Sequence, residues 1–351
     1  MFSGLGGLDS DVDDSHSAQI TGEGFLLKRR TPLVNSVVLL LKLAFAVAIL
    51  AALWRVADGQ GAIELLTEGD PIWLVASAMA LLLQVLLSAM RWRLTASQLG
   101  IHFSRKTAVR EYFLSQIVNQ VLPGGVVGDA GRAVRSRGES RIFTAGQAVV
   151  LERVAGQFGL IVFLLAGALT ATFSKEGVEL PRSILIVLGI LVLGGILTSV
   201  TLASISRLSH GALAEALNNF ATSTRVALWA KGVRARQIAF SIGTAACNIA
   251  GFSFAAIAVG SSFSVLTAIT MVPLILTAMI VPLTVAGWGF REGAAVLLFP
   301  AFGLSSTEGL ATSIVFGLVA LSVSLPGLVV VFRRKAKSQE SGQVPVEGAV
   351  R

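Results

Sequence analysis

Long apolar runs constrain this chain more than any other feature of its sequence. Runs of about 20 apolar residues recur from residue 33 to residue 332, and short segments between them carry most of the charge. A helix of about 20 apolar residues crosses the hydrocarbon layer of a bilayer. Only 14% of the residues are charged, whereas a soluble domain carries about 25%. We therefore expect an all-α polytopic membrane protein.

Basic residues predict how the chain is oriented. Lys28, Arg29 and Arg30 precede the first apolar run, and Arg333 and Arg334 follow the last one. Basic residues collect on the cytoplasmic side of a membrane. Both termini are therefore expected in the cytoplasm, with an even number of full crossings of the cytoplasmic (inner) membrane.

Two kinds of apolar segment can be distinguished. The expected full spans cover residues 33–54, 71–90, 142–173, 182–202, 237–260 and 309–332. Two other pieces, at residues 107–122 and 265–304, are interrupted by glycine or proline. This predicts about six full transmembrane helices plus two re-entrant or broken elements, or eight helices if these cross. Two broken segments that open to opposite sides are typical of inverted repeats in transporters.

The remaining segments suggest a simple domain organisation. Residues 1–31 are acidic and rich in serine and glycine, which predicts a disordered cytoplasmic tail. Residues 32–335 would form the transmembrane domain, and residues 336–351 a second cytoplasmic tail. The loop at residues 203–236 carries five basic residues against one acid, so we expect it to be cytoplasmic and partly helical.

The first candidate site is the stretch LPGGVVGDAGR at residues 122–132. Basic residues flank it on both sides, which favours a re-entrant half-helix entered from the cytoplasm; a shallow amphipathic helix is the alternative. Glycine lets a ligand approach the backbone closely, and backbone N–H groups beside arginines suit a phosphate. Alternatively, the arginines only set the topology. The residues predicted to bind a head group are Gly124, Gly125, Gly128, Asp129, Arg132 and Arg135.

The second candidate site is the pair Glu152-Arg153 inside an apolar run. A charge at the bilayer centre costs about 2.5–3.5 kcal/mol on insertion scales. Neighbouring residues on a helix do not face each other, so each side chain needs its own partner. We expect Arg153 to meet Asp129, and Glu152 to meet Arg132 or Lys42. The three residues Lys42, Glu152 and Arg153 would form an intramembrane relay, or else a structural ion pair that locks helices together.

The third candidate site again combines glycine with one acid and one base. It consists of Gly287, Gly289, Arg291 and Glu292. These residues would form a second gate on the outer side; an ordinary outer loop is the alternative.

Several functions lack a signal in this sequence. There is no Walker A loop, HExxH or GxSxG motif, and the three histidines are scattered. We therefore expect no metal and no cofactor. The formal net charge is +8, but the basic residues flank apolar spans, so the membrane surface explains them better than nucleic acid does.

The motifs taken together resemble a known family. They are RWR at residues 91–93, EYF at 111–113 with Asn119, LPGGVVGDAGR, LERVAG at 151–156 and GWGFREG at 287–293. In this order they are similar to the lysylphosphatidylglycerol synthase transmembrane-region family, also called the flippase-like domain family, over about residues 35–335.

The resemblance implies a flippase fold for lipids or lipid-linked sugars. The positions that carry over are Gly124, Gly125, Gly128, Asp129, Arg132, Glu152, Arg153, Gly289 and Glu292. The chain ends shortly after Lys337, so the soluble aminoacyl-transferase domain of bifunctional members, and with it lysyl-lipid synthesis, is not expected. The second half reads AGWGFREG where a PGG-like run is commoner in the family.

Three functions are compatible with these observations. The first is translocation, without catalysis, of an anionic phospholipid or polyprenyl-phosphate-linked sugar. The second is a membrane enzyme that transfers a glycosyl or acyl group to a lipid, with Asp129 or Glu152 as the base. The third is a non-catalytic partner that docks a soluble glycosyltransferase through residues 203–236 and the C-terminal tail. Each is compatible with an oligomer.

Overall fold

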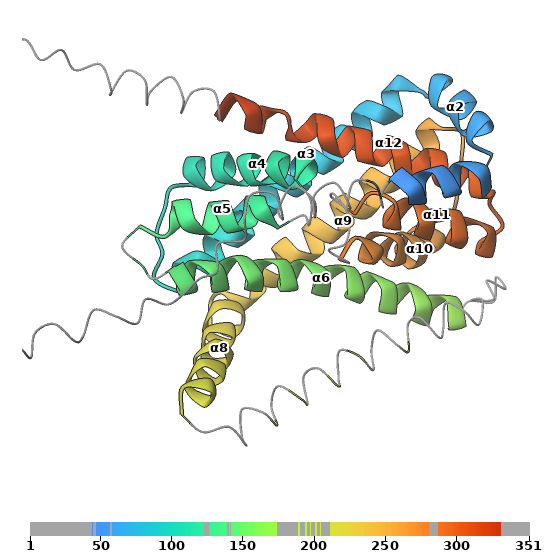
Figure 1. Ribbon diagram of the computed structural model, residues 1–351. Helices are drawn as coiled ribbons and strands as arrows, with labels where there is room; N and C mark the ends of the chain where they lie inside the picture. The colour runs from blue at the N-terminus through green and yellow to red at the C-terminus, as the bar shows by residue number, and fades with distance from the viewer. Residues whose placement is uncertain are drawn as a thin grey trace, which may run out of the picture. The chain divides into compact units, whose positions relative to one another are not determined.

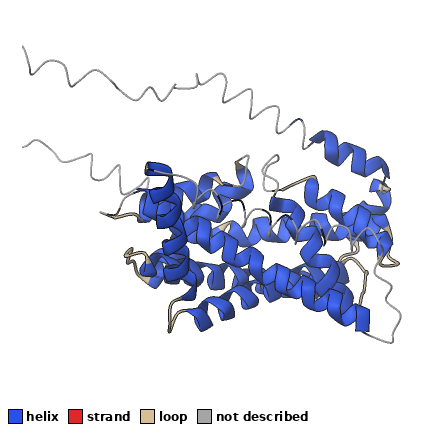
Figure 2. Cartoon of the chain, turned by 90° about the horizontal axis from the view of Figure 1, so that it is seen from below, coloured by secondary structure: helices blue, strands red, loops and turns tan. Residues whose placement is uncertain are grey.

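The computed structural model describes residues 47–56, 58–122, 126–138, 142–173, 211–280 and 287–330, together with a few isolated positions. All regular structure in these ranges is helical (Figure 2). The expected span at 182–202, both predicted tails and most of the span at 33–54 lie outside the described residues. The same holds for Lys42, Gly124 and Gly125.

Four helices are long and apolar enough to cross a membrane. They cover Pro71–Gln98, Ile142–Thr170, Arg234–Ala258 and Ser306–Val330. Each of them overlaps one of the spans expected from the sequence, and each exceeds the length of about 20 residues that a crossing needs. The all-α polytopic class is therefore confirmed for the described part of the chain.

Helix α3 (Pro71–Gln98) places the first functional residues. The side chain of Asp70 accepts a hydrogen bond from the Ile72 N–H at 2.8 Å, and Pro71 occupies the first helical turn. Proline fits this turn because the N–H it lacks would have no helical partner there. The helix continues eight residues past residue 90, where the sequence predicted this span to end, and it therefore includes Arg91. Arg91 is a buried helical residue.

Helices α4 (Arg105–Val121) and α5 (Val127–Ser136) pack against each other, and α5 also packs on α6 (Ile142–Phe173), as Figure 1 shows. Neither α4 nor α5 is one of the four candidate spans. At 17 and 10 residues they would reach about 26 Å and 15 Å, less than the hydrocarbon thickness. Their re-entry from the cytoplasm remains a prediction.

The second half of the glycine stretch is helical. Helix α5 begins at Val127, so Gly128, Asp129, Arg132 and Arg135 lie on a regular helix and not on an irregular turn. The reason is that α4 stabilises the start of α5: the Gly128 N–H donates to Oδ1 of Asn119 at 2.8 Å. A helix start needs such an acceptor because its first N–H groups have no helical partner.

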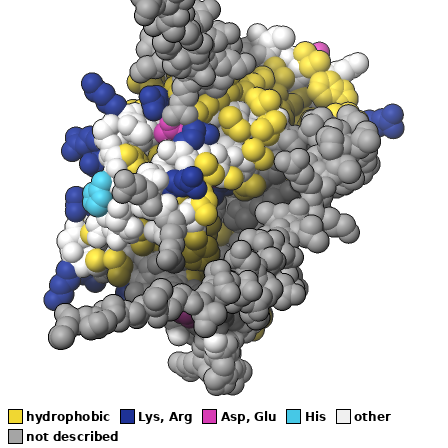
Figure 3. All heavy atoms as spheres, turned by 60° about the vertical axis from the view of Figure 1, so that its left-hand side comes forward, with side chains coloured by type: hydrophobic (Ala, Val, Ile, Leu, Met, Phe, Trp, Pro, Cys, Tyr) yellow, Lys and Arg dark blue, Asp and Glu magenta, His cyan; other side chains and the backbone are white. Residues whose placement is uncertain are grey.

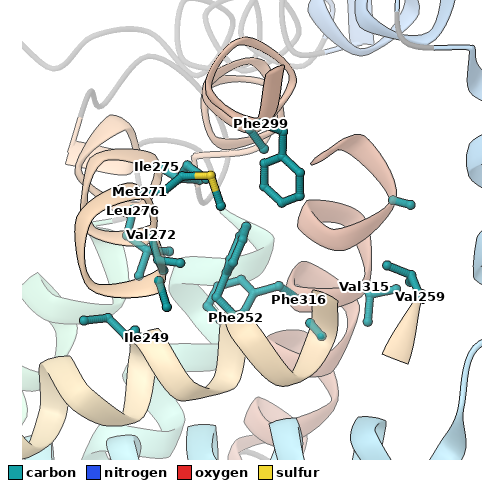
Figure 4. Close-up of a cluster of buried hydrophobic side chains, with 14 of the residues drawn as sticks. Ile249, Phe252, Val259, Met271, Val272, Ile275, Leu276, Phe299, Val315 and Phe316 are labelled. Atoms are coloured by element: carbon teal, nitrogen blue, oxygen red, sulfur yellow. The ribbon is translucent and has the colours of Figure 1, made fainter. Parts of the chain in front are cut away.

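The second half of the described chain is built on an apolar core. Helix α9 (Arg234–Ala258) packs against α3 and α6, and the short helix α8 (Ala212–Trp229) precedes it within the loop that was expected to be partly helical. Phe252 of α9 lies 5.3 Å from Phe316 and 6.4 Å from Phe299, measured between ring centroids. Figure 4 shows Met271 and Ile275 beside these rings. This core fixes the positions of the last three helices.

Those three helices contain the second broken element. Helix α10 (Val265–Thr277) includes Pro273 and runs into a 3-10 turn at Ala278–Ile280. Helix α11 (Phe290–Ala301) lies within the broken element expected at residues 265–304. Arg291 and Glu292 therefore lie in the first turn of a helix. Helix α12 (Ser306–Ser324) then packs against α11.

Candidate functional site

Helices α3, α4, α5 and α6 bring five charged side chains together inside the protein. All five side chains are buried. They are Arg91, Glu111, Asp129, Arg132 and Glu152. Buried charges are tolerated only when they are paired and hydrogen-bonded, so their contacts define the site.

Glu152 on α6 is the centre of this network. Its Oε1 accepts a hydrogen bond from Nη2 of Arg91, and its Oε2 accepts one from Nη2 of Arg132, each at 2.7 Å. The hydroxyl of Tyr112 also donates to Oε1 at 3.4 Å. One carboxylate therefore joins two guanidinium groups that come from α3 and α5.

Aromatic rings hold Arg132 in place. Its guanidinium lies 4.8 Å from the ring centroid of Trp92 and 4.6 Å from that of Tyr112. Its Nε lies 2.9 Å from Oδ1 of Asp129. The two groups form an ion pair, but the N–H does not point at the oxygen well enough for a hydrogen bond. Contacts between a cation and a ring face are worth more when water is excluded. The orientation of this guanidinium is thus determined from three sides.

The electrostatics keep Tyr112 on α4 and Arg132 on α5 each in one protonation state. Burial raises the pKa of Tyr112 to about 12, and the charge of Glu152 adds to this rise. The phenol therefore remains a donor near neutral pH. Burial by itself lowers the pKa of Arg132, but the charges of Glu152 and Asp129 outweigh it and raise that pKa, so Arg132 stays charged.

Asp129 connects the buried network to the surface. Its Oδ1 accepts a hydrogen bond from Oγ of Ser115 at 2.8 Å and pairs with Arg132. Its Oδ2 pairs with Nε of Arg153, whose side chain is 49% exposed. The expected pairs Arg153–Asp129 and Glu152–Arg132 are both present. Asp129 thus lies between a buried and a half-exposed arginine.

A second acid extends the network on α4. Nε of Arg135 donates to Oε2 of Glu111 at 2.6 Å, and Nη2 of Arg110 lies 3.5 Å from Oε1. Both arginines are partly exposed, while Glu111 is buried. The ion pairs on α3–α6 therefore join five arginines to three carboxylates.

Another cluster lies between α11 and α12. Arg291 and Glu292 form an ion pair, and Nε of Arg291 donates to Oγ of Ser313 at 2.9 Å. Oε2 of Glu292 accepts the Gly289 N–H at 2.6 Å. Gly289 has a φ of 92°, which a residue with a Cβ rarely adopts. Arg291 and Glu292 are almost completely buried, so the reading as an ordinary outer loop is wrong for them.

Comparison with protein families decides the classification. The model of the family described as "Lysylphosphatidylglycerol synthase TM region" matches residues 39–327, which include both clusters. The chain belongs to this family. No match was found among curated proteins or among solved structures. The expected family is therefore confirmed, and with it a membrane protein related to lipid synthases and flippase-like domains.

The structure of this family member shows where the predicted site residues within its described ranges lie. Asp129, Arg132, Glu152 and Arg153 form one network, and Arg135 joins its edge through Glu111. Gly287, Gly289, Arg291 and Glu292 lie together at the start of α11. The roles of these residues in binding or gating stay predictions. Among the described residues, no group of three or more histidine, cysteine or acidic side chains could hold a metal ion.

Gly128 has a different role from the one expected of it. A Cβ at this position would collide with the carbonyl oxygen of Ser115 and would lie 2.8 Å from Oδ1 of Asn119. Its N–H already donates to Asn119. The glycine therefore permits close packing of α5 on α4, and its own N–H group is not available to a phosphate.

Three residues of the network on α3–α6 were not among the site residues predicted from the sequence. Arg91 was noted only as part of the RWR motif at residues 91–93. Tyr112 and Glu111 were noted only as part of a motif. One feature could have pointed to Arg91. If the helix continues to residue 98, Arg91 lies on the same helix as its neighbour Trp92, and the ring of Trp92 stacks on Arg132.

Proposed function

We propose that this protein translocates an anionic phospholipid or a polyprenyl-phosphate-linked sugar across the cytoplasmic membrane and catalyses no covalent reaction. The head group would bind at the network on α3–α6, while the apolar chains stay in the bilayer. The cluster at the start of α11 would act on the opposite side of the path. The membrane lipid is both the substrate and the principal partner.

The position of Asp129 carries this proposal. Asp129 pairs at the same time with Arg132, which is 1% exposed, and with Arg153, which is 49% exposed. A phosphate that reaches Arg153 from the surface can compete with Asp129 for the guanidinium, because arginine binds phosphate and carboxylate in the same bidentate geometry. The buried arginine then offers the next binding position.

The charge balance of the network favours an anion. Five arginines face three carboxylates in the described ion pairs, which leaves a surplus of two positive charges. On the face that Figure 3 shows, most of the lysine and arginine side chains lie toward the left-hand side, and some of them border apolar surface. A polar head group and apolar chains would find complementary surfaces where the two kinds of side chain meet.

Measurement of lipid scrambling in proteoliposomes tests the proposal. Wild-type protein should move a fluorescent phosphatidylglycerol across the bilayer faster than protein-free liposomes do. Arg153→Gln should reduce the rate about tenfold, equivalent to about 1.4 kcal/mol, because Asp129 then loses its exchangeable partner. Arg137→Gln alters an exposed arginine at the end of α5 and should change the rate less than about twofold.

Two results would contradict the proposal. The first is a wild-type rate equal to that of empty liposomes for phosphatidylglycerol and for a polyprenyl-phosphate sugar alike. The second is an equal loss in Arg153→Gln and Arg137→Gln, because general surface charge would then explain the effect.

A transferase is the weaker alternative. Its base would have to be Asp129 or Glu152, yet the two oxygens of Glu152 already accept hydrogen bonds from Arg91, Arg132 and Tyr112. A general base needs a lone pair within reach of the substrate proton. Turnover of a labelled glycosyl or acyl donor by the purified protein would support the enzyme instead. A docked glycosyltransferase and an oligomer remain predictions from the sequence.

A further inference from the structure

Arg91 belongs to the network on α3–α6, but it lies on a different helix from the site residues that were predicted from the sequence. It lies on α3, is 3% exposed, and donates through Nη2 to Oε1 of Glu152. Gly156 of α6 lies beside it: a Cβ there would be 2.8 Å from Nη2. The glycine therefore makes room for this guanidinium between α3 and α6.

Arg91 and Arg132, the two arginines that Glu152 joins, retain hydrogen-bond donors without an acceptor. Nε and Nη1 of Arg91 are buried and have no hydrogen-bond partner, and the same is true of Nη1 of Arg132. A buried donor without an acceptor costs free energy, and the cost is larger for a charged group. Natural proteins therefore tend to supply such donors with a partner.

The second cluster does not share this property. Arg291 is equally buried, but none of its nitrogens is left buried without a hydrogen-bond partner. Glu292, Ser313 and the rings of Trp288 and Phe316 surround it. Of these two clusters in the described part of the chain, the one around Arg91 and Arg132, which a single carboxylate holds together, is thus the one with unpartnered arginine donors.

We propose that Arg91 is a binding residue for the phosphate of the substrate, and that it acts jointly with Arg132. The free edges of the two guanidinium groups would hold oxygens of one phosphate group, while Glu152 keeps both groups in position. The aromatic rings that stack on Arg132 limit its rotation. This inference deepens the proposed function, since it makes a phosphate, and not just any negative charge, the recognised group.

Binding of short-chain lipids to the detergent-solubilised protein tests the assignment without transport. Dihexanoyl phosphatidylglycerol should raise the melting temperature of the wild type more than dihexanoylglycerol, which lacks the phosphate. Arg91→Lys keeps the charge but loses the planar fork of donors, so the half-saturating lipid concentration should rise about tenfold, or about 1.4 kcal/mol. Arg93→Lys lies on the same helix and has its Nε on the carbonyl of Phe103; it should stay within about twofold of wild type.

A second variant keeps the test decisive if Arg91→Lys does not fold. Gly156→Ala displaces Nη2 of Arg91 without removing any charge, whereas Gly146→Ala on the same helix has open space around its new Cβ. Only Gly156→Ala should weaken the binding of dihexanoyl phosphatidylglycerol.

The outcomes separate this inference from the proposed function. Equal stabilisation by the two lipids, or equal binding by Arg91→Lys and Arg93→Lys, overturns the role of Arg91 even if the protein moves lipids. Binding that depends on Arg91, together with no movement of lipids in liposomes, supports the role of Arg91 and overturns translocation.

Discussion

Gly128 shows how a single residue determines the geometry of the site. A Cβ there would collide with the carbonyl oxygen of Ser115, whose hydroxyl donates to Asp129 at 2.8 Å. Asn119, one turn further along α4, accepts the Gly128 N–H. The small residue thus lets α5 approach α4 closely enough for Ser115 to reach Asp129.

Replacement of Gly128 should therefore separate the two helices. We expect Gly128→Ala to lower the free energy of unfolding by about 1–3 kcal/mol, because added volume in a packed contact forces the backbone to shift. Gly146→Ala is the control, since no atom lies within 4 Å of its new Cβ and alanine favours a helix by about 1 kcal/mol over glycine. Thermal unfolding in one detergent would compare them, and equal melting temperatures would contradict the contact.

Helices α11 and α12 begin in the same way but in different surroundings. Each has a glutamate at its third position that accepts the N–H of the residue before the helix: Glu292 from Gly289 at 2.6 Å, and Glu308 from Ser305 at 2.7 Å. The bond at Glu308 is exposed, whereas that at Glu292 is buried. Glu292 also neutralises Arg291, so the same local motif has a second task at the start of α11.

This difference between the helices predicts unequal effects of one substitution. Glu292→Gln should destabilise the protein by about 3–5 kcal/mol, because it leaves the charge of Arg291 buried without a carboxylate. Glu308→Gln should cost less than about 1 kcal/mol, since its cap remains hydrated. Chemical unfolding followed by tryptophan fluorescence would measure both. Similar losses would mean that the ion pair adds nothing to the cap.

At the scale of the whole molecule, the two ends of α3 differ in charge: acidic residues precede the helix and basic residues follow it. Glu68 and Asp70 precede the helix, while Arg105 and Lys106 follow it. With 28 residues the helix is about 42 Å long, enough to cross the hydrocarbon layer. The acidic end is expected outside and the basic end in the cytoplasm.

Accessibility labelling would test this orientation. In a Cys247→Ser background, Glu68→Cys should react with a membrane-impermeant maleimide added to intact cells, because its side chain is exposed at the acidic end of α3. Lys106→Cys, which is also exposed, should react only after the membrane is permeabilised. The reverse pattern would invert the predicted topology.

Local rules explain why much of this protein could be predicted. The length of an apolar run predicts that it forms a membrane-spanning helix and approximately where that helix lies, so all four candidate spans were found from the sequence. The pairs Arg153–Asp129 and Glu152–Arg132 could also be predicted, because adjacent residues on a helix must have different partners and few opposite charges lie within the membrane segment.

Contacts between helices were decided only by the tertiary structure. The burial of Arg91 and the packing of Gly128 on α4 depend on distances between segments that are remote in sequence. The pairing of Arg291 with its own neighbour Glu292 depends on one particular rotamer. Hydropathy and helical period determine which face of a helix is apolar. They do not determine how closely two helices approach, and that distance selects the partners of Arg91, Glu111 and Glu152.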